Sequence, residues 1–252
     1  MTKKQLDFIP ILATCIGGSL IGLAPVFVRT SEVGPSFTGF YRFLFATIII
    51  FIFGIISKKL KFLSLKNTFL IGLPGLFFGT DIVLWHSSIT YTSIAHATLF
   101  VNTAPLYVCL LGFLLFNEKL NKLFLISLII CFVGVFVLIT NNSNFFGESG
   151  SFGDSLSFLA AFFYACYLLS INRFSKTIDT FNLIFYSSLF ACIPLGIGSL
   201  FELDKIFPDS MYGWLNFLGQ AIFVQILGQG LVIYGLSKIR PQLSSLLLLF
   251  QP

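Results

Sequence analysis

The chain has 252 residues, of which 56% are hydrophobic and only 10% are charged, and its formal net charge is +5. Soluble globular domains average about a quarter charged residues, so this composition excludes a soluble domain and indicates a membrane protein in a lipid bilayer. The positive charges lie mostly in the connections between apolar runs, which gives no reason to expect a nucleic-acid partner.

Nine apolar runs follow one another along the chain, and we expect each to be a helix. An apolar helix of about 20 residues spans the hydrocarbon core of a bilayer. The ninth run opens at Pro241 and reaches only about twelve residues, too few to cross, so we expect the natural chain to continue beyond Pro252. The sequence thus predicts an all-α integral membrane protein, whose earlier runs cover Phe8–Val28, Pro35–Ser57, Thr68–His86, Ile94–Phe116, Leu123–Thr140, Phe152–Ile171, Phe181–Phe201 and Trp214–Tyr234.

The lysines and arginines predict the orientation of the chain. All of them except Arg29, Arg42 and Lys205 lie at the N-terminus or in the even-numbered connections between runs. Cytoplasmic connections of membrane proteins carry an excess of Lys and Arg. We therefore expect a multi-pass protein of the inner (plasma) membrane, with its N-terminus and its even-numbered connections in the cytoplasm.

Two pairs of segments indicate an internal repeat. Phe40–Ala46 (FYRFLFA) and Phe185–Ala191 (FYSSLFA) are identical at five of seven positions. Ser87–Pro105 aligns without gaps with Tyr234–Pro252, and a proline ends both segments. The two pairs are separated by nearly the same number of residues, which favours a duplicated unit.

The repeat predicts two units, residues 1–145 and 146–252, of which the second is inverted. The matching segments are five spans apart, an odd number, so the second unit must enter the membrane from the opposite side. The charges of the connections agree, because the connection after the second run is rich in lysine whereas its counterpart after the seventh, FELDKIFPD, is mostly acidic. Inverted-topology repeats are typical of secondary transporters.

Stretches in both halves carry a recognisable family pattern. They are Gly34-Pro35, Tyr41-Arg42, TDIVLWHSSITYTSIAHATLFVNTAPLY from Thr80, NEK from Asn117, GDSLSFLAAFFYACY from Gly153 and QILGQGLVIYGLSKIRPQLSSLLLLFQP from Gln225. Over essentially the whole chain they resemble the EamA-like family of the drug/metabolite transporter superfamily. The resemblance implies a permease of two inverted five-helix repeats, here cut off within the ninth helix, that carries amino acids or related small solutes.

Arg42 and Asp81 are the costliest of the charged residues that lie within apolar runs. A charge at the bilayer centre costs about 2.5–3.5 kcal/mol on insertion scales, so such residues usually face a cavity or a partner. We expect both to line the pathway and bind solute, with Asp81 also a candidate proton acceptor. The alternatives are a structural ion pair, or an arginine that reaches out to the interface.

Three further residues flank the connection between the third and fourth runs. His86 and His96 are candidates for proton coupling, since histidine titrates near neutral pH, although both could simply be interfacial. Trp85 is a candidate for solute binding that could close the pathway from outside. The alternative for Trp85 is an anchor in the aromatic belt of the membrane.

Prolines and amides inside the runs are the remaining candidates. Pro105 and Pro252 occupy matching points of the two units and predict helix kinks, which are tolerated where they line a cavity. Amides could bind solute groups or join helices to one another at about 0.6 kcal/mol each. The amide candidates for solute binding are Asn102, Gln225, Gln229 and Gln251.

These features predict a secondary-active permease that works by alternating access, with export favoured over uptake. The chain contains no hydrolase triad order, nucleophile elbow or phosphate loop, so we expect no catalytic residue, no enzyme activity, no metal and no cofactor. The GxxxG pairs Gly18–Gly22 and Gly75–Gly79 favour packing within the bundle and leave a homodimer face as the alternative. A membrane-embedded enzyme acting on lipid head groups and a passive channel are the competing functions.

Overall fold

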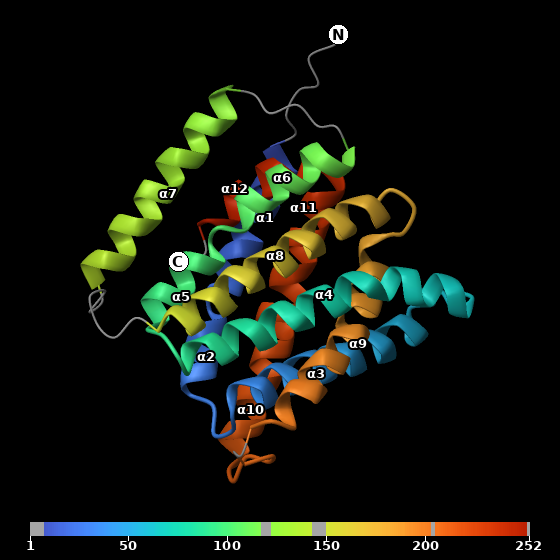
Figure 1. The fold of residues 1–252 in the computed structure, drawn as a ribbon. Coiled ribbons are helices and arrows are strands. Elements are labelled where there is room, and N and C mark those ends of the chain that lie inside the picture. The colour runs from blue at the N-terminus through green and yellow to red at the C-terminus, as the bar shows by residue number, and fades with distance from the viewer. Residues whose placement is uncertain (1–7, 117–121, 143–149, 203–204, 251–252) are drawn as a thin grey trace.

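The computed structural model describes residues 8–116, 122–142, 150–202 and 205–250, and within these ranges every regular element is a helix (Figure 1). In chain order the elements are α1 (Phe8–Ile21), α2 (Ala24–Arg29), α3 (Pro35–Ile56), α4 (Leu65–Ile89), α5 (Ile94–Val101), α6 (Ala104–Phe116), α7 (Lys122–Asn142), α8 (Ser151–Phe174), α9 (Thr180–Ser199), α10 (Met211–Gly219), the π-helix η1 (Gln220–Gln229), α11 (Gly230–Lys238) and α12 (Pro241–Leu248). Each of the nine apolar runs therefore forms helix.

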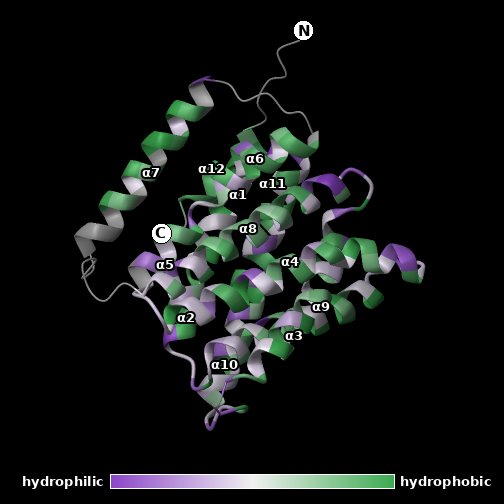
Figure 2. Cartoon of the chain, in the orientation of Figure 1, coloured by the Kyte–Doolittle hydropathy of each residue, from purple (hydrophilic) through white to green (hydrophobic). Residues whose placement is uncertain are grey.

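Seven helical stretches of the described chain are long and apolar enough to cross a membrane: Phe8–Arg29, Pro35–Ile56, Leu65–Ile89, His96–Leu115, Ser151–Phe174, Thr180–Ser199 and Met211–Lys238. Hydrophobic residues predominate along these helices (Figure 2), and large apolar side chains such as Phe53 and Ile197 are exposed on them. Exposed apolar surface of this extent suits lipid rather than water. The all-α membrane fold expected from the sequence is confirmed.

Local chemistry explains where several helices begin. Proline opens α3 at Pro35 and α12 at Pro241, because the first turn of a helix needs no N–H from that residue. Side-chain oxygens cap three other helices: those of Ser93, Asp179 and Ser210 each accept a hydrogen bond from the backbone N–H three residues later. Such caps stabilise a helix by about 1 kcal/mol.

Two of the apolar runs are broken rather than merely bent. The first run divides between α1 and α2 at Gly22 and Leu23, and the fourth divides between α5 and α6 at Asn102 and Thr103. Pro25 and Pro105 each occupy the second residue of the helix that follows the break. Pro105, where a kink was predicted, thus follows a two-residue interruption of the helix, whereas Pro252 lies outside the described residues.

Helix α4 lies in the middle of the bundle and packs closely against α8 and α9. Glycines on α4 allow this approach, because a Cβ on Gly75 would lie 2.1 Å from Ser187 O and one on Gly79 would lie 2.6 Å from Ala191 O. Small residues let membrane helices approach backbone to backbone. The second GxxxG pair is therefore used inside the bundle.

We expect Gly75→Val to separate α4 from α9 and to lower the melting temperature of the detergent-solubilised protein. Overpacking a filled interface typically costs about 1–3 kcal/mol. Gly134→Val in α7 is the matched control, since a Cβ at Gly134 would meet nothing within 4 Å. Thermal denaturation followed by size-exclusion chromatography would measure both variants. Equal melting temperatures for the two would contradict the packing argument.

Candidate functional site

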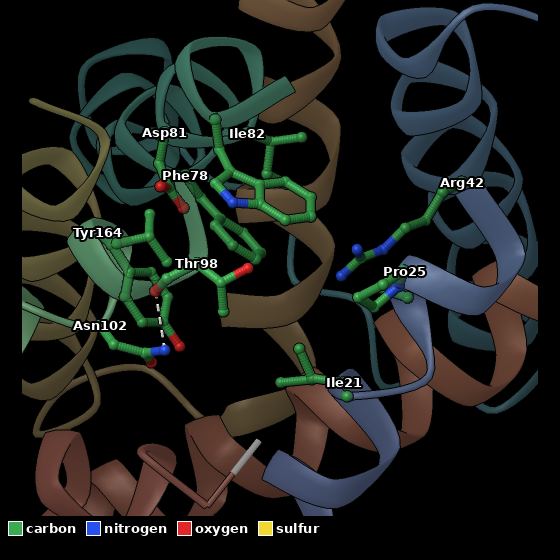
Figure 3. A pocket seen from close by; sticks show the side chains of 13 residues that line it. Ile21, Pro25, Arg42, Phe78, Asp81, Ile82, Thr98, Asn102 and Tyr164 are labelled. Carbon is green, nitrogen blue, oxygen red and sulfur yellow. Dashed lines mark hydrogen bonds between the residues drawn. The ribbon is translucent and has the colours of Figure 1, made fainter. Parts of the chain in front are cut away.

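A cavity of about 400 Å³ lies among the helices of the bundle (Figure 3). Five of the apolar runs contribute to its wall, which is formed by Ile21, Gly22, Ala24, Pro25, Arg42, Phe78, Asp81, Ile82, Trp85, Thr98, Val101, Asn102 and Tyr164. Residues on both sides of the α1–α2 break line it, and so do residues immediately before the α5–α6 break. The two interrupted helices therefore meet the cavity where their backbones are interrupted.

The polar residues of the cavity lie at one depth in the bundle. Arg42 is seven residues from the start of α3, Asp81 is eight from the end of α4, and Asn102 is eight from the start of α5. At 1.5 Å per residue these distances correspond to about 10–12 Å below that end of the bundle. Asp81 lies deeper than the expected run Thr68–His86 implies, because α4 continues beyond His86 to Ile89.

Arg42 is buried, with 6% of its surface exposed, and is only partly satisfied. Its Nη2 donates a hydrogen bond of 2.9 Å to Oε1 of Gln225, and its guanidinium lies 5.1 Å from the ring centroid of Phe43 and 6.0 Å from that of Phe78. Its Nε has no hydrogen-bond partner. The guanidinium is thus held in place while part of its donor capacity remains available.

Asp81 is also buried, with 7% of its surface exposed, and within the described chain it forms no recorded hydrogen bond or ion pair. Arg42 and Asp81 line the same cavity, yet no nitrogen of Arg42 lies within 4.0 Å of its carboxylate. The structure therefore does not contain the ion pair that the sequence left open as an alternative. Figure 3 shows the two side chains on opposite sides of the space.

Gln225 and Gln229, two of the amide candidates for solute binding, do not line the cavity. Both are completely buried in η1. Nε2 of Gln225 donates to Ser188 Oγ at 3.0 Å, and Nε2 of Gln229 donates to the hydroxyl of Tyr167. Gln225 reaches the cavity only through Arg42, so its observed position is that of a support for the guanidinium.

The other predicted residues divide between the cavity and its surroundings. Trp85 lines the cavity, and its Nε1 has no partner, which differs from the belt position favoured by its place near a helix end. Asn102 also lines it, and its Nδ2 donates to Thr98 O at 2.9 Å. His86 is buried but is not part of the wall. Gln251 lies outside the described residues.

His96 lies away from the wall, next to the start of α8. Its Nδ1 is 3.4 Å from Asp154 Oδ2, and the hydroxyl of Thr92 donates to Asp154 Oδ1 at 2.7 Å. This group joins the α4–α5 connection to α8. Whether His86 or His96 takes part in proton coupling stays a prediction.

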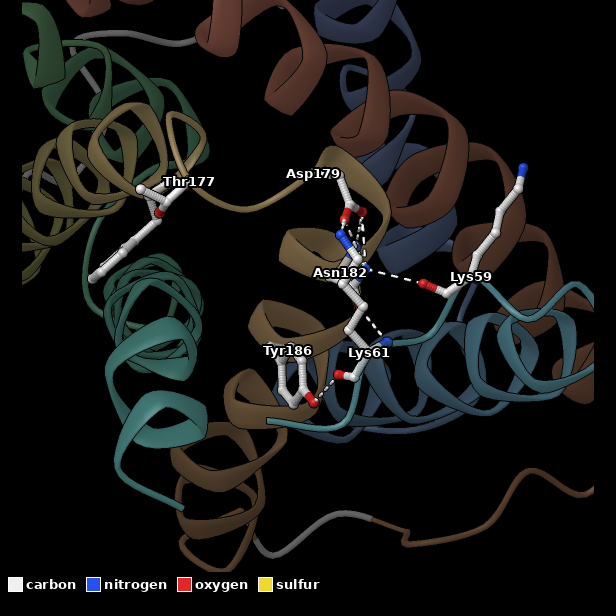
Figure 4. Close-up of polar contacts among 7 residues, drawn as sticks. Lys59, Lys61, Thr177, Asp179, Asn182 and Tyr186 are labelled. Atoms are coloured by element: carbon white, nitrogen blue, oxygen red, sulfur yellow. Dashed lines mark hydrogen bonds and ion pairs between the residues drawn. The ribbon is translucent and has the colours of Figure 1, made fainter. Parts of the chain in front are cut away.

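One end of the bundle, which we call the basic end, is held together by polar contacts between the α3–α4 connection and the start of α9 (Figure 4). Lys61 Nζ lies 2.9 Å from Asp179 Oδ2. Asn182 bridges the same segments, since its Oδ1 accepts from Lys61 N at 2.9 Å and its Nδ2 donates to Lys59 O at 3.1 Å. The hydroxyl of Tyr186 donates to Lys61 O at 2.8 Å.

The opposite end, which we call the acidic end, is closed by two carboxylates. Glu202, which follows α9, accepts hydrogen bonds from the backbone N–H groups of Ser36 and Phe37 at the start of α3. Glu32 accepts from the backbone N–H groups of Asp209 and Ser210 and from the Ser210 hydroxyl. These bonds, with that of the Ser210 side chain first, hold the pKa of Glu32 below its ordinary value.

The connections that contain Lys61 and Glu202 thus lie at opposite ends of α3. This is the arrangement that the hypothesis of inverted units requires for homologous connections. The division into residues 1–145 and 146–252 and the inversion itself stay predictions.

The basic end gives a pH prediction for Asp179. Partial burial raises the pKa of this carboxyl, but hydrogen bonds from Asn182 and Lys61 outweigh it and hold the pKa below its ordinary value. A carboxyl with a depressed pKa stabilises the fold above its unfolded pKa of about 3.9, and this stabilisation is lost as the pH falls through the folded pKa. We expect Asp179→Ala to destabilise the protein by about 1 kcal/mol at neutral pH, through loss of the cap.

Melting curves of wild type and Asp179→Ala between pH 3 and pH 8 would test this prediction. The gap between the two proteins should be constant near neutral pH and should narrow as the pH falls below about 4. Asp179→Asn is the matched control, because asparagine can still cap the helix and should cost less. A gap that widens on acidification would contradict the assignment.

Comparison with known proteins identifies the family. The model of the EamA-like transporter family matches residues 8–140 and 151–252, which is nearly the whole chain. The chain belongs to the EamA-like transporter family. The resemblance noted from Arg42, the stretch from Thr80 and the stretch from Gln225 is thereby confirmed, and this EamA-like protein is a multi-pass membrane transporter.

Two curated relatives of this EamA-like transporter come from Bacillus subtilis (strain 168), and both are described as uncharacterized transporters. YetK is 25% identical over 255 aligned positions, covering 95% of this chain and 74% of the relative. YyaM is 25% identical over 219 positions, covering 81% and 70% respectively. A solved crystal structure superposes with a TM-score of 0.76 at 16% identity, covering 96% of this chain and 83% of the other, which shows the common fold.

Several residues of the cavity were missed by the sequence interpretation. Phe78, Thr98 and Tyr164 line the wall but are ordinary residues for an apolar helix, so no signal distinguished them. Pro25 did carry a signal, because a proline three residues after Gly22 inside an apolar run predicts a break in the same way as Pro105 does.

Proposed function

We propose that this EamA-like transporter is a secondary-active permease that moves amino acids or related small solutes by alternating access, with export rather than uptake as its direction. The observation that carries the proposal is the cavity of about 400 Å³ with a buried arginine and a buried aspartate in its wall that do not pair with each other. Pockets of about 300 Å³ and above accommodate small organic ligands.

The charges of the wall favour a solute that carries a carboxylate and an amine. The guanidinium of Arg42 offers a planar fork of donors that matches a carboxylate, and its Nε has no other partner. Asp81 supplies the complementary negative charge on the other side of the cavity. Two charges left unpaired in a buried wall are costly, and a zwitterionic solute would neutralise both.

The aromatic side chains of the wall complete the chemistry of the proposed site. Phe78, Trp85 and Tyr164 surround the polar groups and offer apolar surface to the remainder of a solute. Binding sites of this type combine mostly apolar walls with a few polar groups that orient the ligand. The proposed cargo therefore carries its charges at one end and a variable apolar part at the other.

The architecture supports alternating access. The family model matches two separate segments, and the short helices α5 and α12 have eight residues each and begin at residues 94 and 241. Discontinuous helices beside a central site are typical of transporters built from inverted repeats. We propose two such units, with the basic end in the cytoplasm and the chain in the inner membrane, in accordance with the distribution of Lys and Arg.

Counterflow in proteoliposomes would test the function. The purified chain would be reconstituted into vesicles loaded with an unlabelled amino acid, and entry of the labelled compound would be followed over a panel of neutral, acidic and basic amino acids. We expect entry that saturates with concentration and that is accelerated by the solute inside. Entry no faster than into empty vesicles for the whole panel would contradict the proposal.

The same experiment separates the competing functions. A passive channel would give flux that neither saturates nor responds to solute on the other side. A membrane enzyme would return a chemically altered label, which chromatography of the vesicle contents would reveal.

A further inference from the structure

The α5–α6 break leaves one backbone carbonyl of a wall residue without its helical hydrogen-bond donor. In an unbroken helix the N–H of residue 105 would donate to the carbonyl of Val101, but Pro105 has no N–H. The N–H groups of Asn102, Thr103 and Leu106 already donate to carbonyls of the same turns. The carbonyl of Val101, a residue of the wall, is thus released from the helical pattern and is available as an acceptor.

Oxygens of two side chains of the wall, those of Asp81 and Asn102, are further acceptors. Only 7% of the surface of Asp81 is exposed, and among the described residues its carboxylate forms no hydrogen bond or ion pair. Asn102 donates through Nδ2 to Thr98 O at 2.9 Å, which leaves its Oδ1 as a further acceptor. Figure 3 shows Asp81, Thr98 and Asn102 on one side of the cavity and Arg42 on the other.

We propose that Asp81, the Oδ1 of Asn102 and the freed carbonyl of Val101 form a subsite for one compact monovalent cation. A buried carboxylate without a partner is costly, and a bound cation would compensate it. Carbonyls at interrupted helices are established ligands for coupling cations in secondary transporters.

The composition of the subsite selects the charge of its occupant. It contains a single carboxylate, so one positive charge balances it, whereas divalent ions usually take several charged oxygens. In the part of the chain that the structure describes, no group of three or more His, Cys, Asp or Glu residues could hold a metal ion. The ligands are all oxygens, which suits an alkali ion or a primary ammonium group and does not suit a transition metal.

The two sources of such a cation have different meanings for transport. An ammonium group would belong to the solute itself, with its carboxylate on Arg42 at the other wall. An alkali ion would be a second, co-transported species. The inference rests on the proposed function only in taking the cavity as the solute site, and the binding measurement does not depend on transport.

Tryptophan fluorescence offers a direct measurement of cation binding. The chain has two tryptophans, and Trp214 packs against Tyr41 and Phe217 whereas Trp85 lines the cavity. In a Trp214→Phe background the emission therefore reports on the cavity alone. Purified protein would be titrated at constant ionic strength with NaCl, KCl or methylammonium chloride in exchange for choline chloride, since the quaternary nitrogen of choline has no N–H and cannot approach the three oxygens as closely as a compact cation.

We expect a saturable change with an alkali ion, with methylammonium or with both. A response to Na⁺ or K⁺ assigns the subsite to an alkali ion, and a response to methylammonium alone assigns it to the ammonium group of the solute. The absence of a saturable response to all three cations overturns the proposal.

Variants of Asp81 and Asn102 test whether these residues bind the cation. Asp81→Asn should raise the midpoint concentration by about tenfold or more, and Asn102→Ala should raise it by a smaller factor. Asp154→Asn is the matched control, because it removes a carboxylate that binds Thr92 and His96 outside the wall, and its midpoint should stay unchanged. An unchanged midpoint in both Asp81→Asn and Asn102→Ala overturns the proposal, as does an equal loss in Asp154→Asn.

Counterflow with the same preparation keeps the two proposals distinct. Saturable counterflow without any cation response rejects the cation subsite and leaves the permease function intact. A cation response without counterflow of any solute supports the subsite and rejects the proposed cargo.

Discussion

Arg42→Met should raise the KM for a carboxylate-bearing solute by roughly 30-fold or more, corresponding to about 2 kcal/mol. Methionine keeps much of the length of the side chain and removes the charge and the donors. The buried guanidinium is held by Gln225 and has an unpartnered Nε at the cavity, so its loss leaves the solute carboxylate buried without a counter-charge. The concentration dependence of counterflow in proteoliposomes measures the effect.

Two variants calibrate this result. Arg42→Lys keeps the charge but loses the planar fork, so it should fall between wild type and Arg42→Met. Arg29→Met removes the same charge from the exposed last turn of α2, outside the wall, and should leave the KM unchanged. An Arg42→Met protein with wild-type KM would remove the arginine from the solute site.

Asp81→Asn should abolish proton-linked accumulation of solute while the protein still inserts and purifies normally. Asparagine is close to aspartate in size but cannot exchange a proton. If one proton accompanies each solute, a gradient of one pH unit is worth about 1.4 kcal/mol and can drive roughly tenfold accumulation. Asp81→Asn should reduce that accumulation to the level measured without a gradient.

Uptake with and without an imposed pH gradient gives the comparison. Asp154→Asn serves again as the control, since it removes a carboxylate that lies apart from the wall and should keep the gradient effect. Persistence of the full gradient effect in Asp81→Asn would exclude Asp81 as the proton acceptor. His86, which is buried, and His96 would then be the remaining candidates for the proton acceptor.

The helices themselves could be predicted from sequence because lipid imposes a simple rule. A segment that crosses hydrocarbon must satisfy its backbone internally and cover itself with apolar side chains, so each span appears as an apolar run of the required length. The same cost makes Arg42 and Asp81 conspicuous, and the structure places both in one cavity. Their roles in solute binding and proton coupling stay predictions.

The contacts of buried side chains could be predicted less well from the sequence than the helices could. Gln225 and Gln229 were candidates for solute binding because amides can bind polar solute groups, but the sequence does not say which neighbour each amide meets. The segment is a π-helix, and its amides turn toward Arg42, Ser188 and Tyr167 instead of the cavity. The position of Trp85 near a helix end likewise fits both a side chain that faces lipid and one that faces the cavity, so the sequence could not distinguish the two.

The contacts at the basic and acidic ends have a mechanical consequence. The segment after α3 is fastened to the start of α9 by Asn182, and the segment after α9 is fastened to the start of α3 by Glu202. Because α3 and α9 are joined at both ends by these contacts, we expect them to move as one rigid pair. A movement that exposes Arg42 first to one compartment and then to the other would therefore also displace Ser188 of α9. The interrupted helices around α3 and α9 would then have to bend.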